Sequence, residues 1–139
     1  MSYNSHKNIF AFLIFAAFLL RSISADCNPF AQPFYVHVID NINSKDPLLL
    51  HCASGDDELG NHTLYNNGVF NFKFCETFFH RTLFFCRFRW TWKSIAVDVY
   101  KSKSRFDCSS FHCFWSARTD GIYFSGLNPP KNWTKRYSW

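Results

Sequence analysis

Alternation of apolar and polar residues constrains the fold of this chain more than any other feature. In Phe70–Phe74, three phenylalanines alternate with Asn71 and Lys73, a pattern that gives a β-strand one apolar and one polar face. Six further segments read as short strands: Phe34–Ile39, Leu48–Cys52, Phe84–Trp90, Ile95–Val99, Phe111–Ala117 and Ile122–Phe124. Helix signals are almost absent after residue 25. We therefore predict an all-β fold, a small antiparallel β-sandwich of about seven or eight strands, with a barrel as the alternative.

Turn residues separate these segments. Asn66–Gly68 suits positive backbone dihedral angles between two strands, and Thr119–Gly121 does the same for the last hairpin. The chain has 18 phenylalanines. Most lie on the alternating faces, so they indicate an aromatic core rather than an aromatic ligand site. Phe78, Phe79 and Phe85 are less easily placed inside, and we expect them to form an exposed patch.

The N-terminus predicts export. Lys7 precedes an apolar run of twelve residues, Ile9–Leu20, which Arg21 ends. Small residues follow, so this is the pattern of a secretory signal peptide cleaved after Ser24 or Ala25. The run is short for a membrane span, which needs about 20 apolar residues. An uncleaved signal anchor is the alternative, and the predicted location is extracellular.

We predict that the chain has three parts: a signal peptide (1–25), a sandwich domain (26–127) and a C-terminal tail (128–139). The tail lacks periodicity, and Pro129 and Pro130 end any strand there. We expect an exposed extension of basic and aromatic residues. The tail has three possible roles that the sequence does not separate: contact with a partner, contact with a membrane, or no role at all.

The charge of the mature chain is modest. Removing Lys7 and Arg21 leaves 13 basic residues against 10 acidic ones, a net charge of +3. The basic residues are scattered, which argues against a nucleic acid partner. A basic exported protein could still contact acidic cell-wall polymers or anionic lipid head groups.

Six cysteines follow the signal peptide: Cys27, Cys52, Cys75, Cys86, Cys108 and Cys113. An even number of cysteines in an exported chain predicts a disulfide framework. Three bridges allow 15 connectivities, and spacing alone does not choose among them. Because no Cys-x-x-Cys pair occurs, we expect no zinc, and we predict no metal or cofactor.

The strongest polar cluster is Asp56-Asp57-Glu58. Calcium takes 6–8 oxygen ligands from a recognisable loop, and the spacing here does not supply one. We interpret the cluster as a solvated acidic turn that offers its side chains to a partner. Leu59 is expected to return to the core, and Gly60 to permit a sharp exit.

Two sequons occur, Asn61-His62-Thr63 and Asn132-Trp133-Thr134. In an exported chain, both asparagines are glycosylation candidates. Asn61 is the stronger one because it follows the acidic turn.

Enzyme chemistry finds little support. The histidines after the signal peptide are His37, His51, His62, His80 and His112. A secreted ribonuclease would use two histidines as acid and base, but the histidine motifs of such enzymes are absent. No nucleophile elbow, phosphate loop or two-histidine metal helix occurs either. We therefore predict no catalytic residues.

Three motifs together carry a family resemblance. The first runs from His51 to Gly60, the second is Thr82–Trp90, and the third is Cys113–Ser116 leading to Asp120–Tyr123. In this order and spacing they resemble the plant self-incompatibility S-protein homologue family. The resemblance implies a small secreted β-sandwich protein. It also implies an extracellular signal rather than an enzyme.

The resemblance also suggests a disulfide map. The usual family cysteines correspond to Cys52, Cys86, Cys108 and Cys113. We join Cys52 to Cys113 and Cys86 to Cys108. Cys27 and Cys75 are then additions in this chain, and we pair them with each other.

The first functional hypothesis is a secreted plant signalling protein of the self-incompatibility S-protein type. It would be a monomeric ligand, not embedded in the membrane, that a cell-surface receptor protein recognises through loops. The loop at Asp56-Asp57-Glu58 and the loop Lys101–Asp107 are the expected surfaces. The alternatives are a cationic defence protein acting on membranes or walls and, third, a secreted hydrolase. The modest charge and the lack of an amphipathic helix argue against the defence protein.

Overall fold

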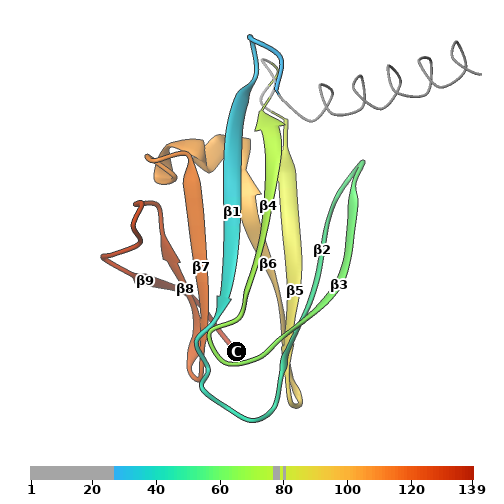
Figure 1. The fold of residues 1–139 in the computed structure, drawn as a ribbon, viewed down its shortest axis with the longest axis vertical. Coiled ribbons are helices and arrows are strands. Elements are labelled where there is room, and N and C mark those ends of the chain that lie inside the picture. The colour runs from blue at the N-terminus through green and yellow to red at the C-terminus, as the bar shows by residue number, and fades with distance from the viewer. Residues whose placement is uncertain (1–26, 77–78, 80) are drawn as a thin grey trace, which may run out of the picture. The chain divides into compact units, whose positions relative to one another are not determined.

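The computed structural model describes residues 27–76, 79 and 81–139. The predicted signal peptide therefore lies outside the described residues. The chain divides into a short unit, Met1–Phe30, and a main unit, Ala31–Trp139. The strands of the main unit form two sheets (Figure 1).

The described residues contain nine strands and one 3-10 helix. They are β1 (Gln32–Asp40), β2 (Leu48–Ser54), β3 (Glu58–Leu64), β4 (Val69–Glu76), β5 (Leu83–Trp90), β6 (Lys93–Lys101), η1 (Ser102–Asp107), β7 (His112–Arg118), β8 (Gly121–Ser125) and β9 (Thr134–Ser138). The five-stranded sheet has the order β4-β1-β7-β8-β9, and the four-stranded sheet has the order β3-β2-β5-β6. The predicted all-β sandwich is confirmed. One pairing departs from the antiparallel pattern, because β1 and β7 run parallel.

The inner faces of the two sheets enclose the core. In β5, Phe84, Cys86 and Phe88 are at most 3% exposed, whereas Arg87 and Arg89, at the alternate positions, face solvent. The predicted alternation along this strand is therefore confirmed. The other sheet meets it with further buried side chains: Phe34, Val36, Val38, Trp115, Ala117, Ile122 and Phe124. Removal of this apolar surface from water stabilises the fold.

Two strands differ from the sequence prediction. Glu58–Leu64 forms β3, although its side chains are mostly polar, because it pairs antiparallel with β2. The prediction of an extension without regular structure is wrong for Thr134–Ser138, which pairs antiparallel with β8. Both prolines lie in the loop before this strand, so they do not interrupt its ladder. Tyr137 packs against the core from this edge.

The expected turns and exposed aromatics are largely found. Asn67 has a φ of 61° and lies in the turn before β4, as its Asn-Gly sequence indicates. Phe79 and Phe85 are 78% and 40% exposed. Phe78 lies outside the described residues. Leu59 packs against the core as predicted.

The predicted disulfide map requires correction. Cys52 bonds to Cys86, and Cys108 bonds to Cys113, so both pairings inferred among these four cysteines are wrong. Cys52 and Cys86 lie directly opposite each other on β2 and β5. Their Cα atoms are 4.0 Å apart, slightly below the about 4.5 Å of the closer kind of opposed pair on antiparallel strands. A bridge within one sheet, Cys52–Cys86, and a short-range bridge, Cys108–Cys113, therefore replace the two bridges expected. Cys27 and Cys75 are also disulfide-bonded, and their mutual pairing stays a prediction.

Candidate functional site

The acidic turn connects β2 to β3 and is held by Ser54. The Ser54 hydroxyl accepts hydrogen bonds from the backbone N–H groups of Asp56 and Asp57, at 3.3 and 3.0 Å. The Ser54 N–H in turn donates to the Asp57 carbonyl oxygen at 2.8 Å. Because the backbone makes these bonds, the side chains of Asp56 and Asp57 are not used by the turn, and both residues are exposed. The turn therefore presents two carboxylates to solvent on a fixed backbone.

Glu58, predicted with them, has a different environment. It begins β3, and its carboxylate lies 2.5 Å from His51 Nε2 on β2, within hydrogen-bonding distance. The same carboxylate accepts a hydrogen bond from the Gly60 N–H at 3.1 Å. Gly60 has a φ of 78°, in the left-handed region that glycine adopts readily. The Glu58 carboxylate is therefore engaged inside the hairpin, unlike those of Asp56 and Asp57.

An open groove runs beside the acidic turn. Asp56 and Asp57 line one part of it, and Lys73 and Arg81 line another. Phe85 and neighbouring aromatic side chains also line this groove. The groove thus brings opposite charges and apolar surface together, the mixture found where proteins recognise each other.

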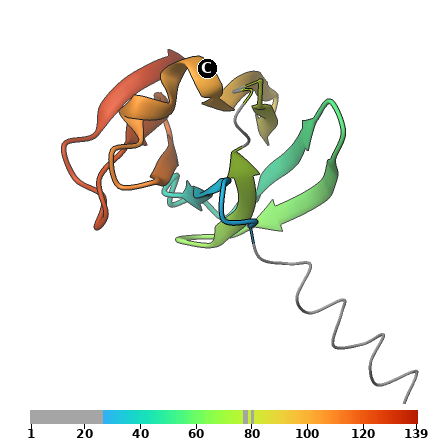
Figure 2. The same ribbon diagram turned by 90° about the horizontal axis from the view of Figure 1, so that it is seen from above.

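The second predicted loop is the 3-10 helix η1, and it borders a separate hollow. The hollow has a volume of about 280 Å³ and is lined by residues of β6, η1 and β9 and by the inner face of β7 and β8. Arg136 and Tyr137 of β9 belong to its wall. In Figures 1 and 2, the β2–β3 hairpin and the β8–β9 edge lie on opposite sides of the main unit. The hollow and the acidic turn are therefore separate sites.

Two ion pairs lie at the rim of the hollow. Lys101 Nζ is 2.9 Å from an Asp98 carboxylate oxygen, and this contact raises the pKa of Lys101. Arg136 is 3.9 Å from Asp107, too far for a hydrogen bond. The four side chains are between 38% and 51% exposed, so solvent reaches them.

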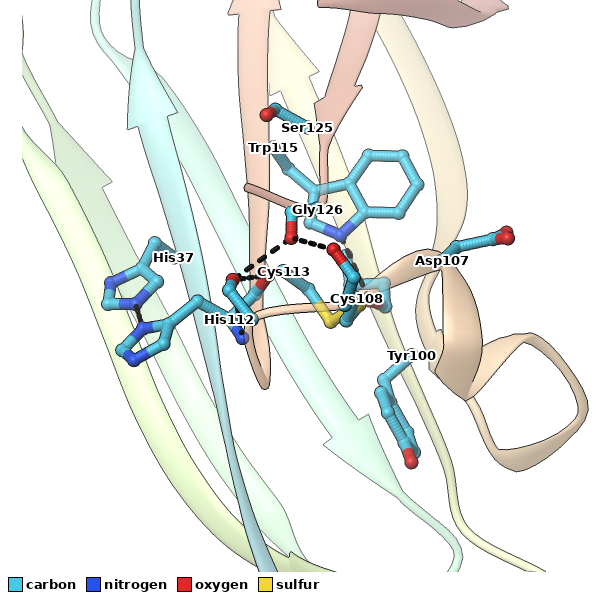
Figure 3. Close-up of a disulfide and its surroundings, with 12 residues drawn as sticks. His37, Tyr100, Asp107, Cys108, His112, Cys113, Trp115, Ser125 and Gly126 are labelled. Atoms are coloured by element: carbon cyan, nitrogen blue, oxygen red, sulfur yellow. Dashed lines mark hydrogen bonds between the residues drawn. A yellow bond between two sulfur atoms is a disulfide. The ribbon is translucent and has the colours of Figure 1, made fainter. Parts of the chain in front are cut away.

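Several contacts hold η1 in place (Figure 3). The Cys108–Cys113 disulfide joins its end to β7. Gly126 follows β8, and a Cβ atom at this position would collide with the Asp107 carbonyl oxygen. At the start of η1, buried Glu76 accepts hydrogen bonds from the Tyr100 hydroxyl at 2.6 Å and the Ser102 hydroxyl at 2.7 Å. Burial and the bond to Glu76 raise the pKa of Tyr100.

The histidines do not gather in the groove or the hollow. His37 Nε2 and His112 Nδ1 are 2.9 Å apart on the outer face of β1 and β7 (Figure 3), and both rings stack with Phe114. Burial and the neighbouring His112 lower the pKa of His37. His62 is hydrogen-bonded to the Leu59 carbonyl oxygen, and His80 lies outside the described residues. Among the described histidines, none lines the groove or the hollow.

Both predicted glycosylation asparagines are exposed. Asn61 lies on β3, the edge strand of its sheet, and Asn132 lies in the loop before β9. Among the described residues, no group of three His, Cys, Asp or Glu side chains is placed to hold a metal ion. No helix in the described part of the chain is long and apolar enough to cross a membrane.

Arg136 and Tyr137, which β9 adds to the wall of the hollow, were not predicted as site residues from the sequence. Tyr137 and Trp139 are both partly buried against the core, with exposed Ser138 between them. This alternation is the signal that would have identified an edge strand.

Comparison with known proteins decides the family. Residues 35–139 match the sequence profile of the family described as plant self-incompatibility protein S1. The chain belongs to this family. It is 36% identical over 136 residues to S-protein homolog 29 of Arabidopsis thaliana, a match covering 98% of each chain. It is 30% identical over 120 residues to self-incompatibility protein S1 of Papaver rhoeas, a match covering 84% of this chain and 82% of the other.

A solved structure supports the fold independently. Its title describes SPH, or self-incompatibility protein homologue, proteins as a widespread family of small, highly stable, secreted proteins from plants. The TM-score is 0.56 at 21% identity, and the match covers 78% of this chain and 91% of that one. The family resemblance read from the sequence is confirmed.

Proposed function

We propose that this protein is a secreted plant signal that a cell-surface receptor recognises, with the acidic turn as a contact surface. The observation that supports this proposal most is the fixed, exposed presentation of Asp56 and Asp57 by the Ser54 hydrogen bonds. A preorganised loop loses little conformational freedom when it binds. Exposed charges at an interface act mainly on the association rate and on specificity.

The proposed mechanism is recognition without chemistry. The receptor would place cations against Asp56 and Asp57 and apolar groups along the neighbouring groove. Membership of the self-incompatibility protein S1 family is consistent with such a role. We propose that the protein acts as a monomer, without a cofactor or catalysis, and that its signal peptide is removed during export.

The test is a binding experiment on the oxidised protein secreted from a eukaryotic host. Labelled protein is applied to plant cells, pollen tubes included, while a calcium reporter is read. Saturable binding and a calcium response are expected, and the double charge reversal Asp56→Lys with Asp57→Lys abolishes both. The matched control is Asp46→Lys, because Asp46 is also exposed and lies in another loop. Binding that is not saturable, or that survives the reversal at Asp56 and Asp57, contradicts the proposal.

A cationic defence protein is the second candidate. The outer face of β5 carries exposed Arg87 and Arg89 beside Phe85, which is 40% exposed. Cations next to exposed aromatic surface suit an anionic membrane. Leakage of anionic vesicles, with binding that follows surface charge and no calcium signal in intact cells, would favour this candidate. If the vesicles do not leak and binding to cells is saturable, the defence candidate is excluded.

A further inference from the structure

The hollow beside η1 combines a buried aromatic floor with cations at its rim. Trp115 and Phe124 are 6% and 7% exposed and line its inner part, and Tyr137 lines it from β9. The Arg136 side chain is 44% exposed. Its guanidinium lies 4.9 Å from the centre of the Phe124 ring. Apolar walls with a few convergent polar groups are the usual features of a small-molecule site.

Arg136 retains hydrogen-bonding capacity at this rim. Its Nε–H donates to the Thr134 hydroxyl at 3.3 Å. One terminal nitrogen lies 3.9 Å from the Asp107 carboxylate, beyond hydrogen-bond range. Lys101 differs, because it contacts Asp98 at 2.9 Å. Of the two cations at the rim, Arg136 is therefore the one placed to bind an incoming anion.

The chemistry of the guanidinium indicates the kind of anion. Its planar array of N–H donors matches a carboxylate in a bidentate arrangement. The ring contact with Phe124 leaves the guanidinium beside the aromatic floor. Asp107 also lines the hollow, with its carboxylate 3.9 Å from Arg136 and turned away from the Trp115 indole (Figure 3). A ligand carboxylate would therefore take the hydrogen bonds of Arg136 that Asp107 does not make. A ligand that carries both a planar ring and a carboxylate satisfies the floor and the rim together.

We propose that the hollow binds a small aromatic carboxylic acid, with the ring against Trp115 and Phe124 and the carboxylate on Arg136. A volume of about 280 Å³ lies just below the roughly 300–1,000 Å³ of most ligand sites, which suits a small ligand of one or two fused rings. This site goes beyond the proposed receptor contact, because the acidic turn lies on the opposite side of the main unit (Figures 1 and 2). The hollow and the acidic turn can therefore be tested separately, with substitutions at one site that leave the other unchanged.

The test uses the full secreted protein, oxidised and labelled with nitrogen-15. Indole-3-acetate is titrated against it by calorimetry and NMR, with neutral indole-3-acetamide as the matched probe. The acid is expected to bind saturably, about tenfold or more tighter than the amide, because the amide lacks the charge that Arg136 recognises. The Trp115 Nε1–H, which donates to the Val99 carbonyl oxygen, supplies a resonance at the site. It shifts during the titration.

Two variants locate the binding. Arg136→Gln is expected to weaken the acid about tenfold or more and to leave the weak binding of the amide unchanged. The matched control Arg89→Gln removes an exposed arginine from the other sheet and changes neither ligand. Both variants are checked for a native spectrum. The proposal is overturned if the acid does not saturate, if the amide binds equally well, or if Arg136→Gln has no more effect than Arg89→Gln.

Discussion

The indole of Trp115 donates its Nε1–H to the carbonyl oxygen of Val99, 2.9 Å away. Trp115 belongs to β7 and Val99 to β6, so this hydrogen bond joins the two sheets across the core. It satisfies two polar groups where both residues are at most 6% exposed. A buried donor or acceptor without a partner is costly. The alignment of the two sheets beside the hollow therefore depends on this pair.

The substitution Trp115→Phe tests this role. It removes the donor, leaves the Val99 carbonyl oxygen without its partner and leaves unfilled volume in the core. The free energy of unfolding is expected to fall by about 2–4 kcal/mol, measured by urea denaturation. Trp92→Phe is the matched control, because Trp92 is 87% exposed and should change stability by less than about 0.5 kcal/mol. Equal effects of the two changes would exclude the proposed role of the hydrogen bond.

The disulfides predict a graded loss of stability. The Cys52–Cys86 bridge spans 34 residues, and the Cys108–Cys113 bridge spans 5. Because a bridge across a longer loop restricts the unfolded chain more, replacing the first pair by alanine should cost about 3–4 kcal/mol and the second about 2 kcal/mol. Urea unfolding of the two double variants measures the difference. Peptide mapping of the unreduced protein checks the connectivity directly. A peptide that links Cys52 to Cys113 would contradict the arrangement.

Patterning along the sequence predicted all of the described strands except β3 and β9, which each lie at the edge of a sheet. Alternation identified β5 because Phe84, Cys86 and Phe88 all face the interior. Strand β3 has no comparable pattern, since its residues are mostly polar and its strand conformation depends on pairing with β2. Propensity and patterning carry little information where pairing across the sheet determines the conformation.

The candidate sites were only partly predictable for the same reason. Asp56 and Asp57 were found because an acidic turn is a local feature of the sequence. The hollow assembles Asp98, Arg136 and Trp115 from three separate strands, and no local pattern relates such residues. The correct disulfides likewise required the register that sets Cys52 opposite Cys86. Spacing along the chain does not determine that register.

Glycosylation at Asn61 is the next prediction. Asn61 is exposed on an edge strand, where a glycan meets no neighbouring strand on its outer side. Protein secreted from a eukaryotic host should carry a glycan in the peptide containing Asn61, read by mass spectrometry before and after enzymatic deglycosylation. Thr63→Ala removes the sequon but keeps the asparagine, so it should abolish the modification as fully as Asn61→Gln does. An unmodified Asn61 peptide from the parent protein contradicts this expectation. We expect Asn132 to be modified less completely.

The outer-face histidines make stability depend on pH. His37 has a pKa below its ordinary value of 6.5, because of burial and of His112 beside it. On the paired strand β4, Asn71 lies opposite His37, and Lys73 is two residues further along. The carboxylate of β4, Glu76, lies five residues beyond Asn71 and accepts hydrogen bonds from two hydroxyl groups, so it does not oppose this shift. Well above pH 6.5, both the folded and the unfolded chain hold His37 neutral. As the pH falls below this value, the unfolded chain takes up the proton first, and stability decreases until the pH passes the folded pKa.

The measurement compares urea midpoints of the parent protein and of His37→Gln between about pH 7.5 and pH 5. Glutamine does not titrate in this range, and its amide offers His112 a hydrogen-bond partner. The parent should therefore lose more stability than the variant on acidification, so that the two curves converge or cross toward low pH. His62→Gln serves as the control, because His62 bonds to the Leu59 carbonyl oxygen and stacks on Phe70, away from His37. Curves that run parallel for the parent and His37→Gln would show that the His37–His112 pair does not contribute to the pH dependence.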